Sequence, residues 1–500
     1  MALEQLPTAD VFVLTFNAQK QLINVPVFAT HLLDAFSEHA GALPDLVVFS
    51  LQEMAPLAKA FIGTQMLGQY FGAYGEALNR AAARHHAEHA SSGEDATGKK
   101  DPFSLVATRN VGMTSSMLFA RDAAAVSNVR AAEVGFGAGD MANKGAVGLR
   151  LLYTGESDSD SGSRSGSGRE ARSNKTEMTF VTTHLAAMEW NLAKRNKNWE
   201  SLVSGLVFED PKKHVDRAAA QSRDRGAAEP RDEAQGLLEG DEHRSSRASS
   251  LERELHNLSI YKPGSHLFVA GDLNYRIAAT QPDSDDVFPS TDPSSPDYYP
   301  RFLERDQLSH ERRAGRTLHG LSEAEIKFPP TYKLVVLPKD QDEQEQEQEQ
   351  EAEAGEGLAV DNVKWKWATH RWPGWCDRIL YRDLPQGRRM QVVGYNALAP
   401  VRTSDHRPVY LRIRVPLVEP EALAGAPDAI DDDESGVPDT RVKLPFPIDV
   451  DSWHHRASVR RWEAAMGWSL LAAQSKEVVA AVLATIVVLG AGVWWYTALS

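Results

Sequence analysis

Short apolar runs rich in β-branched residues recur along most of the chain and limit the folds that it can adopt. Most of them are continuous or weakly alternating, which is typical of strands buried in stacked sheets. Helical patterns lie between some of the runs, at Val27–Glu38 and Ala55–Tyr70. We therefore predict an α/β sandwich whose strands include Val11–Thr15, Leu46–Ser50, Ser116–Ala120, Ala146–Leu152, Thr179–Thr183, Leu267–Ala270, Arg378–Tyr381 and Val409–Val415.

Four polar segments interrupt this pattern and are predicted to be disordered inserts, near residues 81–101, 155–177, 210–250 and 339–361. They contain too few large apolar side chains to offset the entropy that is lost on ordering. The remainder of residues 1–416 is long enough for one large domain. An acidic linker is expected at residues 417–450.

The net charge of −15 comes from two of these segments and not from the domain. Residues 339–361 hold ten acidic residues and one lysine, and residues 417–440 hold eight acidic residues and no basic one. The rest of the chain is therefore near neutral, at about +2, and is suited to binding anions. The single cysteine, Cys376, excludes an internal disulfide framework and a cysteine-rich zinc site.

The C-terminal segment differs from the rest of the chain, because no charged residue follows Glu477. Residues 478–496 could form a helix close to the roughly 30 Å of a bilayer core, and an aromatic group at 494–496 closes the run. Basic residues precede this run and none follows it, which predicts a single-pass tail anchor with the bulk of the chain in the cytosol. The endoplasmic reticulum is the favoured organelle, and the mitochondrial outer membrane stays open. A buried core helix is the alternative.

Residues 451–476 are predicted to form an amphipathic juxtamembrane segment. Val459, Trp462, Met466 and Leu470 follow helical spacing, with arginines off that face. Two placements are open for such a helix: it could lie in the headgroup layer of a membrane, or it could pack on the globular domain.

Polar residues follow or precede the apolar runs at the ends of the predicted strands. These residues are Asn17, Glu53, His184, Asp272, Asn274, Asp405 and His406. Each one alone could be a turn former, a helix cap or a core histidine. Together they favour a site for a hard divalent cation such as Mg²⁺, which prefers a few oxygen ligands and keeps positions for water and phosphate.

The same residues match the needs of phosphate hydrolysis. Glu53 and Asn17 can supply a carboxylate and an amide oxygen to Mg²⁺. Asp272 can act as the base that deprotonates water, and Asn274 and the two histidines can donate to phosphate oxygens. The sequence has no Walker A loop and no serine nucleophile elbow, which argues against nucleotide-driven transfer. Cys376, between Trp375 and Asp377, is interpreted as a buried small hydrophobic residue and not as a nucleophile.

Six blocks of sequence resemble the inositol polyphosphate 5-phosphatases, in the order of that family. They are Asn143–Val147 (NKGAV), Thr183–Ala187 (THLAA), Gly271–Arg276 (GDLNYR), Phe328–Lys333 (FPPTYK), Pro373–Leu380 (PGWCDRIL) and Ser404–Val409 (SDHRPV). GDLN and SDH alone would indicate the wider superfamily of deoxyribonuclease I, apurinic endonucleases and sphingomyelinases, whereas NYR, PGWCDR and PTYK are typical of the phosphoinositide branch. The resemblance spans about residues 10–415. It implies a four-layer sandwich of two packed mixed β-sheets flanked by helices, in a tail-anchored member of fungal type.

The resemblance also implies roles for the metal and water residues. Glu53 and Asn17 would hold Mg²⁺, and Asp405 would lie near the metal. Asp272 would activate the water, with Asn274 orienting it or the phosphate.

Further residues would contact the substrate. His406 would contact the scissile phosphate, with its imidazole oriented and kept protonated by Asp377. His184 would donate to a phosphate oxygen. The residues expected around the 4-phosphate and the inositol headgroup are Tyr332, Lys333, Arg371, Lys144 and Arg276.

The chain departs from the family pattern at three places. Phe16-Asn17-Ala18-Gln19 stands where the family usually has Trp-Asn-Val-Gly. Ala142 replaces the glycine of the family's MGNKG block, and Thr369 replaces a lysine near the 4-phosphate.

The sequence thus predicts a phosphatase that removes the 5-phosphate of phosphatidylinositol 4,5-bisphosphate with Mg²⁺ at a cytosolic membrane face. Its expected partners are the phosphoinositide and the membrane; no nucleic acid is expected, and no protein partner is indicated. The alternatives are a nuclease or sphingomyelinase of the same superfamily, or a non-catalytic membrane tether that binds phosphoinositide.

Overall fold

The computed structural model describes most of the chain. The described residues are 6–38, 41–89, 101–155, 174–226, 249–338, 358–385, 389–424, 439–476 and a few positions between 484 and 495.

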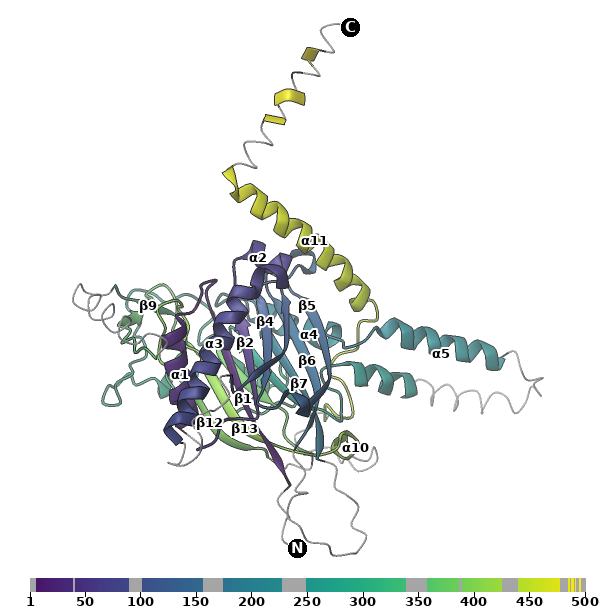
Figure 1. Cartoon of the computed structure of the whole chain (residues 1–500), viewed down its shortest axis with the longest axis horizontal. Coiled ribbons are helices and arrows are strands. Elements are labelled where there is room, and N and C mark those ends of the chain that lie inside the picture. Colours follow the sequence, from purple (N-terminus) through teal and green to yellow (C-terminus); the bar gives the residue numbers. More distant parts are fainter. Residues whose placement is uncertain are drawn as a thin grey trace, which may run out of the picture.

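Two mixed β-sheets form the centre of the molecule (Figure 1). The six-stranded sheet has the order β12 (Gln391–Ala397), β13 (Val409–Pro416), β1 (Thr8–Asn17), β2 (Leu46–Gln52), β4 (Thr114–Ala120) and β3 (Ser104–Val111). The five-stranded sheet has the order β11 (Asp377–Tyr381), β8 (His266–Asp272), β7 (Lys175–His184), β6 (Gly145–Thr154) and β5 (Val126–Gly135). The pairs β1–β2 and β7–β8 are parallel, and the other pairs in these sheets are antiparallel. A separate two-stranded ribbon joins β9 (Leu334–Val336) to β10 (Trp365–Trp367).

Strand β1 shows why the sheets stack and why helices cover them. Its alternate residues point to opposite faces of the sheet. Val11 and Val13 belong to the core between the two sheets, whereas Phe12 and Leu14 belong to a second core on the outer face. A strand that is apolar on both faces must be covered on both.

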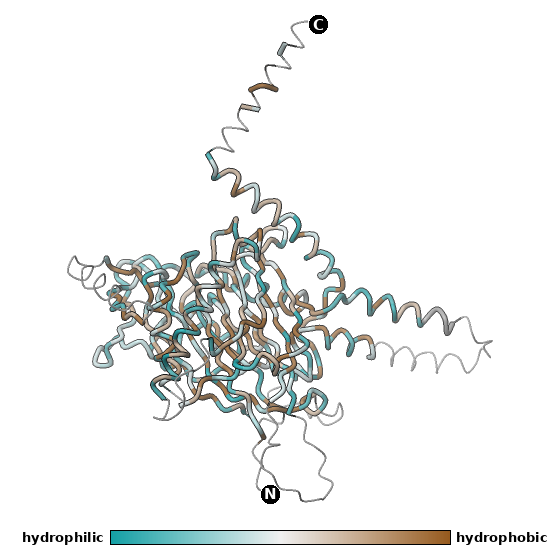
Figure 2. The backbone as a smooth tube through the Cα atoms, viewed as in Figure 1, coloured by the Kyte–Doolittle hydropathy of each residue, from teal (hydrophilic) through white to brown (hydrophobic). Residues whose placement is uncertain are grey.

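Helices cover the two outer faces (Figure 1). On the six-stranded sheet, α1 (Val25–Ser37) and α3 (Thr64–His89) supply the outer core. On the five-stranded sheet, α4 (Leu192–Gly205) does so through residues such as Trp199. The predicted four-layer sandwich is confirmed, and all eight predicted strands are present. Figure 2 shows hydrophobic backbone segments following the inner strands, with hydrophilic segments on the outer loops.

The remaining helical segments lie around these layers. They are α2 (Leu57–Ile62), α5 (Pro211–Gly226), α7 (Pro300–Leu303), α8 (Gln307–Arg313), α10 (Pro420–Ala424), α11 (Ser452–Gln474) and the short 3₁₀ turns η1 (Ala123–Ala125) and η2 (Ala138–Asp140).

The predicted insert at 81–101 is wrong for residues 81–89, which form the last turns of α3. Ala81, Ala82 and His85 are buried there, and the His85 ring packs edge-on against Phe36. The segment is small and polar in composition, but alanine is the strongest helix former and its small side chain lets α3 pack closely on α1. Residues 90–100 lie outside the described part.

The insert predicted at 210–250 is wrong at both ends. Residues 211–226 form α5, and residues 249–258 are also helical. His214 lies 2.9 Å from Glu254 and 3.7 Å from Glu209, so contacts between polar side chains connect these helices where apolar burial is scarce. Residues 227–248 lie outside the described part.

The other two inserts are shorter than predicted where the structure describes them. Gly155 N–H donates to Asn174 O, so β6 and β7 pair up to the edges of the 155–177 segment. Asp361, at the end of the 339–361 segment, pairs with Arg402 at 2.8 Å. Residues 156–173 and 339–357 lie outside the described part.

The acidic linker predicted at 417–450 is wrong for residues 439–450. His256 Nε2 lies 3.0 Å from Thr440 O, and Leu444 and Phe446 pack against the core beneath α4. The last part of the predicted linker is apolar and buries surface on the domain. The prediction rested on the acidic composition of the whole segment, which does not describe this part. Residues 425–438 lie outside the described part.

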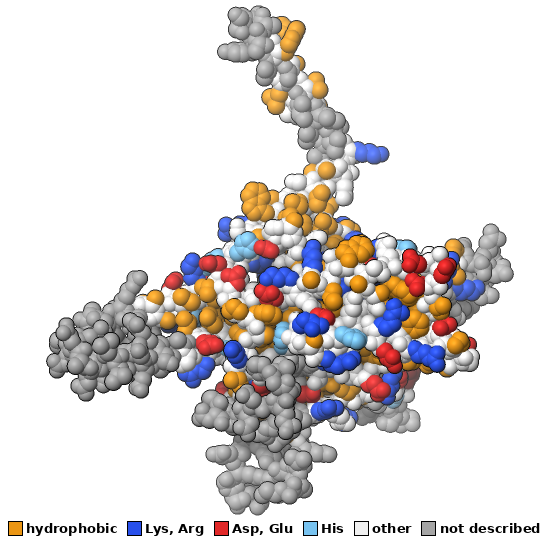
Figure 3. Space-filling view, turned by 180° about the vertical axis from the view of Figure 1, so that it is seen from behind, with side chains coloured by type: hydrophobic (Ala, Val, Ile, Leu, Met, Phe, Trp, Pro, Cys, Tyr) orange, Lys and Arg blue, Asp and Glu red, His pale blue; other side chains and the backbone are white. Residues whose placement is uncertain are grey.

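Helix α11 packs on the domain, as in one of the two placements open for residues 451–476. It contacts α2, and Val459, Glu463 and Gly467 of its inner face are buried. Trp462 and Trp468 are more than half exposed. Figure 3 shows hydrophobic side chains gathered where the C-terminal segment leaves the globular part.

Among the residues described, no helix is both long and apolar enough to cross a membrane. The anchor predicted at 478–496 falls largely on residues outside that part, so it stays a prediction.

A buried network of charged side chains lies at the start of β11, and its contribution to the stability of the fold can be measured. Arg378 is fully buried and bonds to Asp306 at 3.0 Å and to Glu323 at 2.6 Å. Because Arg378→Met leaves the buried Asp306 without its cation and Glu323 with Arg312 alone, we expect a loss of about 3–5 kcal/mol in the free energy of unfolding. Denaturant titration measures it. The matched control is Glu325→Gln, which removes the exposed pair with Lys327 and should cost less than about 1 kcal/mol; equal losses in the two variants would contradict the assignment.

Candidate active site

Pairing between strands brings the predicted site residues together at one end of the two sheets. In the parallel pair β1–β2, Asn17 lies opposite Gln52, so Glu53 follows beside it. In the parallel pair β7–β8, His184 lies opposite Asp272. The antiparallel neighbour β11 places Asp377 opposite Asp272 on the other side.

Asp272 is at the centre of this group and is almost fully buried. Its Oδ2 lies 3.2 Å from His184 Nε2 and 3.9 Å from His406 Nε2, and it accepts from Asn17 Nδ2 at 3.1 Å. Burial acts to raise the pKa of Asp272, but His184, His406 and Lys144 outweigh it and lower that pKa below its usual value. The carboxylate is therefore ionised at neutral pH and is placed to accept a proton.

His406 is held by a buried carboxylate. Its Nδ1 lies 2.8 Å from Asp377 Oδ2, and Asp377 also accepts from Thr331 Oγ1 at 2.6 Å. Burial acts to lower the pKa of His406, but Asp377 raises it to about 9. The imidazole is therefore protonated at neutral pH, and its Nε2–H faces the side of Asp272 and Asp405.

Glu53 and Asn17 form an oxygen-rich corner beside this pair. Glu53 has a left-handed backbone conformation (φ 44°) directly after β2, and its carboxylate pairs with Lys20 at 2.8 Å. Burial acts to raise the pKa of Glu53, but His184, Lys20 and Lys144 lower it overall. An ionised carboxylate next to an amide, at a partly open position, fits a Mg²⁺ ion that keeps most of its water ligands.

Within the described residues, no group of three or more His, Cys, Asp or Glu side chains has the geometry to hold a metal. The donor set that could hold Mg²⁺ is thus Glu53 and the Asn17 amide, whose Oδ1 accepts from Gln19 N–H at 3.1 Å.

The structure places Asp405 beside the basic residues of the site. Its Oδ2 accepts from Lys333 Nζ at 2.5 Å, and its Oδ1 lies 3.9 Å from His406 Nε2. These contacts orient Lys333 and His406.

Asn274 lies next to the base, but its side chain is already bonded. Its N–H donates to Asp272 Oδ1 at 3.1 Å, and its Nδ2 donates to Leu185 O at 3.2 Å. Its Oδ1 accepts from Arg276. Asn274 therefore fixes Asp272 and Arg276 relative to each other.

A group of aromatic and basic side chains borders His406. The Tyr332 ring lies 4.6 Å from the His406 ring, and the Arg276 guanidinium lies 4.4 Å from the Tyr332 ring centroid. Lys333 follows Tyr332 in the chain. Arg371 is at the rim, with Nη2 3.2 Å from Met188 Sδ. Burial acts to lower the pKa of Lys333, but the bond to Asp405 outweighs it and raises that pKa overall.

Lys144 approaches from the opposite side of the site. Its Nζ contacts His184 Nε2, and burial lowers the pKa of Lys144 to about 8. The pKa of His184 is lowered too, by burial and by Lys144. A cavity of about 460 Å³ adjoins Lys144, lined also by Phe136, Asn143, Met188 and Lys194.

Three residues of the site were missed in the sequence. Lys20 pairs with Glu53, and Thr331 donates to Asp377. Ser404 donates to Asn17 O at 2.6 Å and accepts from His406 N–H at 3.0 Å. Thr331 and Ser404 stand inside blocks that were recognised, and Lys20 follows the same strand end as Asn17.

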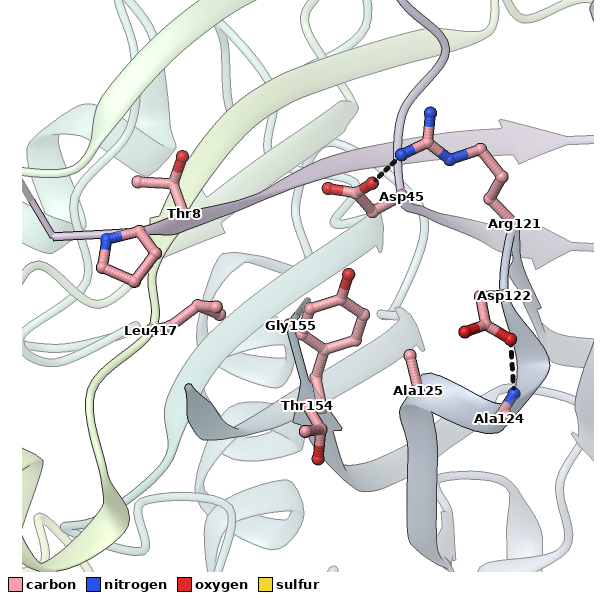
Figure 4. Close-up of a pocket in the computed structure, with 11 residues that line it drawn as sticks. Thr8, Asp45, Arg121, Asp122, Ala124, Ala125, Thr154, Gly155 and Leu417 are labelled. Carbon is pink, nitrogen blue, oxygen red and sulfur yellow. Dashed lines mark hydrogen bonds and ion pairs between the residues drawn. The ribbon is translucent and has the colours of Figure 1, made fainter. Parts of the chain in front are cut away.

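A second cavity, of about 470 Å³, lies at the other end of the sheets (Figure 4). It is lined by residues at the start of β1 and the end of β6, whereas the site residues stand at the end of β1 and the start of β6. Its charged groups already have partners: Arg121 pairs with Asp45 at 2.6 Å, and Asp122 accepts from Ala124 N–H. None of the predicted site residues lines this cavity.

Comparison with known proteins identifies the family. Endonuclease/exonuclease/phosphatase family 2 matches residues 14–412, a range that contains the site residues described above. The chain belongs to this family.

The curated relatives that match this chain include 5-phosphatases of phosphoinositides and inositol polyphosphates. The chain is 23% identical over 296 residues to the human phosphatidylinositol 3,4,5-trisphosphate 5-phosphatase 1, covering 59% of this chain and 18% of that protein. It is 37% identical over 139 residues to the type I inositol polyphosphate 5-phosphatase 5 of Arabidopsis thaliana, covering 28% of this chain and 21% of that protein. The chain thus spans about a fifth of the length of these relatives. The matches support the predicted phosphatase enzyme.

A similar solved structure is the inositol polyphosphate 5-phosphatase domain of spsynaptojanin, in complex with inositol (1,4)-bisphosphate and calcium ion. It is 20% identical with a TM-score of 0.48, covering 82% of this chain and 85% of that one.

The His406–Asp377 pair predicts an unusual titration. NMR of the full chain should show His406 keeping its proton up to about pH 9, and Asp377→Asn should lower that pKa, because Asp377 opposes the effect of burial more than Asp272 and Asp405 do. The stabilisation from this pair is present below pH 6.5 and lost as the pH rises through about 9. The matched control, Asp285→Asn, changes an exposed carboxylate; an unchanged pKa in Asp377→Asn would disprove the role of Asp377.

Proposed function

We propose that the chain is a Mg²⁺-dependent phosphatase that removes the 5-phosphate of phosphatidylinositol 4,5-bisphosphate at a cytosolic membrane face. The observation that carries this proposal is the buried row His184–Asp272–His406–Asp377, with neighbouring separations of 3.2, 3.9 and 2.8 Å. It sets an ionised base beside a protonated donor, which is what hydrolysis of a phosphate ester needs.

The residues divide the reaction between them. Asp272 accepts the proton of the attacking water, whose oxygen forms the new bond to phosphorus while the bond to the inositol oxygen breaks. His406 donates from Nε2 to a non-bridging phosphate oxygen, and Asp377 keeps it protonated. Lys144 faces the same space from the other side and offsets negative charge, and the neutral His184 beside it is placed to bond a phosphate oxygen. Mg²⁺ held by Glu53 and Asn17 would stabilise charge on the phosphate and the leaving oxygen.

The basic border of the site supports a substrate with a second phosphate next to the one that is cleaved. The Tyr332 ring lies 4.6 Å from the His406 ring, Lys333 Nζ lies 5.4 Å from the Tyr332 ring, and Arg371 is close enough to Lys333 to influence its pKa. Lysine and arginine suit phosphate by charge and donor geometry. This arrangement favours the 4,5-bisphosphate headgroup.

The membrane part of the proposal rests on the sequence. Residues 478–496 carry no charge, and basic residues lie only on their N-terminal side. An anchor there, in the endoplasmic reticulum, would keep the domain at high effective concentration near its lipid substrate.

A substrate panel tests the proposed activity. The purified full chain should release phosphate from inositol 1,4,5-trisphosphate and from phosphatidylinositol 4,5-bisphosphate in vesicles, and EDTA should abolish the release. Cleavage of plasmid DNA or of sphingomyelin in place of these would favour the other enzymes of the superfamily. No hydrolysis of any of them, with retained phosphoinositide binding, would make the protein a non-catalytic tether.

Variants of the base and the donor test the mechanism. Asp272→Asn and His406→Ala should each lower kcat by about 100-fold or more, because each removes one proton-transfer or charge-stabilising group. Phosphate release under saturating substrate measures kcat, and circular dichroism checks that the fold is retained. Asp122→Asn, in the distant cavity, is the control and should keep normal turnover. Near-normal kcat in either site variant would contradict the role of that residue as base or donor.

A further inference from the structure

Helix α11 lies beyond the family region, which ends at residue 412, yet it is built into the domain. Its inner face packs on α2, on η2 and on β5. At Gly467 the two backbones nearly touch, because a Cβ there would lie 2.8 Å from Ala58 O. A contact this close fixes the position of the helix along α2.

The inner face of α11 carries a buried carboxylate that reaches into the catalytic domain. Glu463 is 2% exposed, and its Oε1 accepts from the backbone N–H of Ala142 at 2.7 Å. Arg456, on the same face of the helix, donates to both oxygens of this carboxylate. A charged acceptor for a backbone N–H makes a stronger bond than a neutral one.

Ala142 belongs to a tight loop between β5 and β6. Phe136 N–H donates to Lys144 O at 2.8 Å, and Gly137 N–H donates to Met141 O at 2.8 Å, so the loop is closed on itself. On its other side the Ala142 carbonyl lies against Gly112, where a Cβ would come within 1.6 Å. Ala142 is thus clamped between Glu463 and Gly112.

The loop ends on a residue of the site. Lys144 follows Ala142 by two positions, and its Nζ contacts His184, which lies 3.2 Å from Asp272. The path from α11 to the catalytic base therefore runs through Glu463, the Ala142 amide, Lys144 and His184.

Ion pairs hold α11 to the flanks of the same loop. Glu133, on β5, pairs with Arg460 at 3.1 Å and lies 3.7 Å from Arg456. His455 Nε2 lies 2.9 Å from Asp140 Oδ2 on η2. These contacts attach the helix both to β5 and to the loop that follows it, so movement of α11 moves the loop.

We propose that Glu463 is a positioning residue for substrate binding, and that α11 is part of the catalytic unit because it holds the loop that presents Lys144 to the phosphorylated headgroup. This inference rests on the proposed function. It assigns a role in the site to a helix that lies outside the family region.

A double-mutant cycle in the full chain tests this inference. Glu463→Ala should raise the KM for inositol 1,4,5-trisphosphate about tenfold while kcat changes less than about threefold, because the loop loses its anchor but Asp272 and His406 keep theirs. Glu463→Gln keeps an acceptor for the Ala142 amide and should restore most of the affinity. Since Glu463 acts through Lys144, adding Glu463→Ala to Lys144→Ala should raise KM no further.

Two adjacent arginines provide a matched pair that leaves the core intact. Arg460→Glu places a negative charge beside Glu133 and should raise KM about threefold. Arg461 makes no ion pair among the described residues and is exposed, so Arg461→Glu should leave KM unchanged. Equal KM values in these two variants, or additive effects in the double mutant, would overturn the proposal.

A chemical readout keeps the inference separate from the proposed activity. The rate at which a small acylating reagent modifies the Lys144 amine can be followed by mass spectrometry. This rate should change at least threefold in Glu463→Ala and should not change in Arg461→Glu. A chain that releases no phosphate but shows this change would contradict the proposed function and keep the positioning role. An active chain with unchanged Lys144 reactivity and unchanged KM in Glu463→Ala would support the proposed function and contradict the positioning role of Glu463.

Discussion

The site depends on one costly arrangement, an ionised carboxylate buried between the two sheets. Asp272 is almost fully enclosed, and such a group is stable only when cations and hydrogen-bond donors surround it closely. His184, His406 and Asn17 fill that role from three different strands or strand connections. Because these partners come from distant parts of the chain, the stacking of the sheets and the chemistry of the site require the same geometry.

The order of the partners also sets their protonation. Asp377 raises the pKa of His406 against the effect of burial, whereas burial and then Lys144 lower the pKa of His184. Two histidines that face the same carboxylate are thus a charged donor and a neutral neighbour. Their second contacts, not their burial, make this difference, since both are buried.

The C-terminal part of the chain is more closely tied to this site than its composition indicates. Residues 439–450 and α11 pack on the domain, and α11 reaches the substrate side through the Ala142 amide. The segment predicted as an anchor begins a few residues after α11. A membrane-bound segment would then be joined to the Lys144 loop by a helix with little freedom to move.

Local composition was a poor guide where tertiary contacts stabilise polar segments. Residues 81–89 contain alanine and histidine in a pattern that has no large apolar group, yet Ala81 and His85 are buried against α1. The strands β3, β5 and β12 were not predicted for a related reason. Each has exposed or half-exposed positions, and each is ordered by pairing with a neighbouring strand whose register the sequence does not state.

The sequence by itself determined the two-faced apolar strands, the polar residues at their ends and the blocks that carry the family resemblance, because these depend on residue type and on neighbours along the chain. Only the tertiary structure decided that Asp405 lies beside Lys333 and His406, that Asn274 is bonded on all sides, and that Glu463 reaches the Ala142 amide. The physical reason is that hydrogen bonds and ion pairs are set over distances of a few ångströms. Such distances between remote residues exist only once both sheets and the helices that cover them have packed.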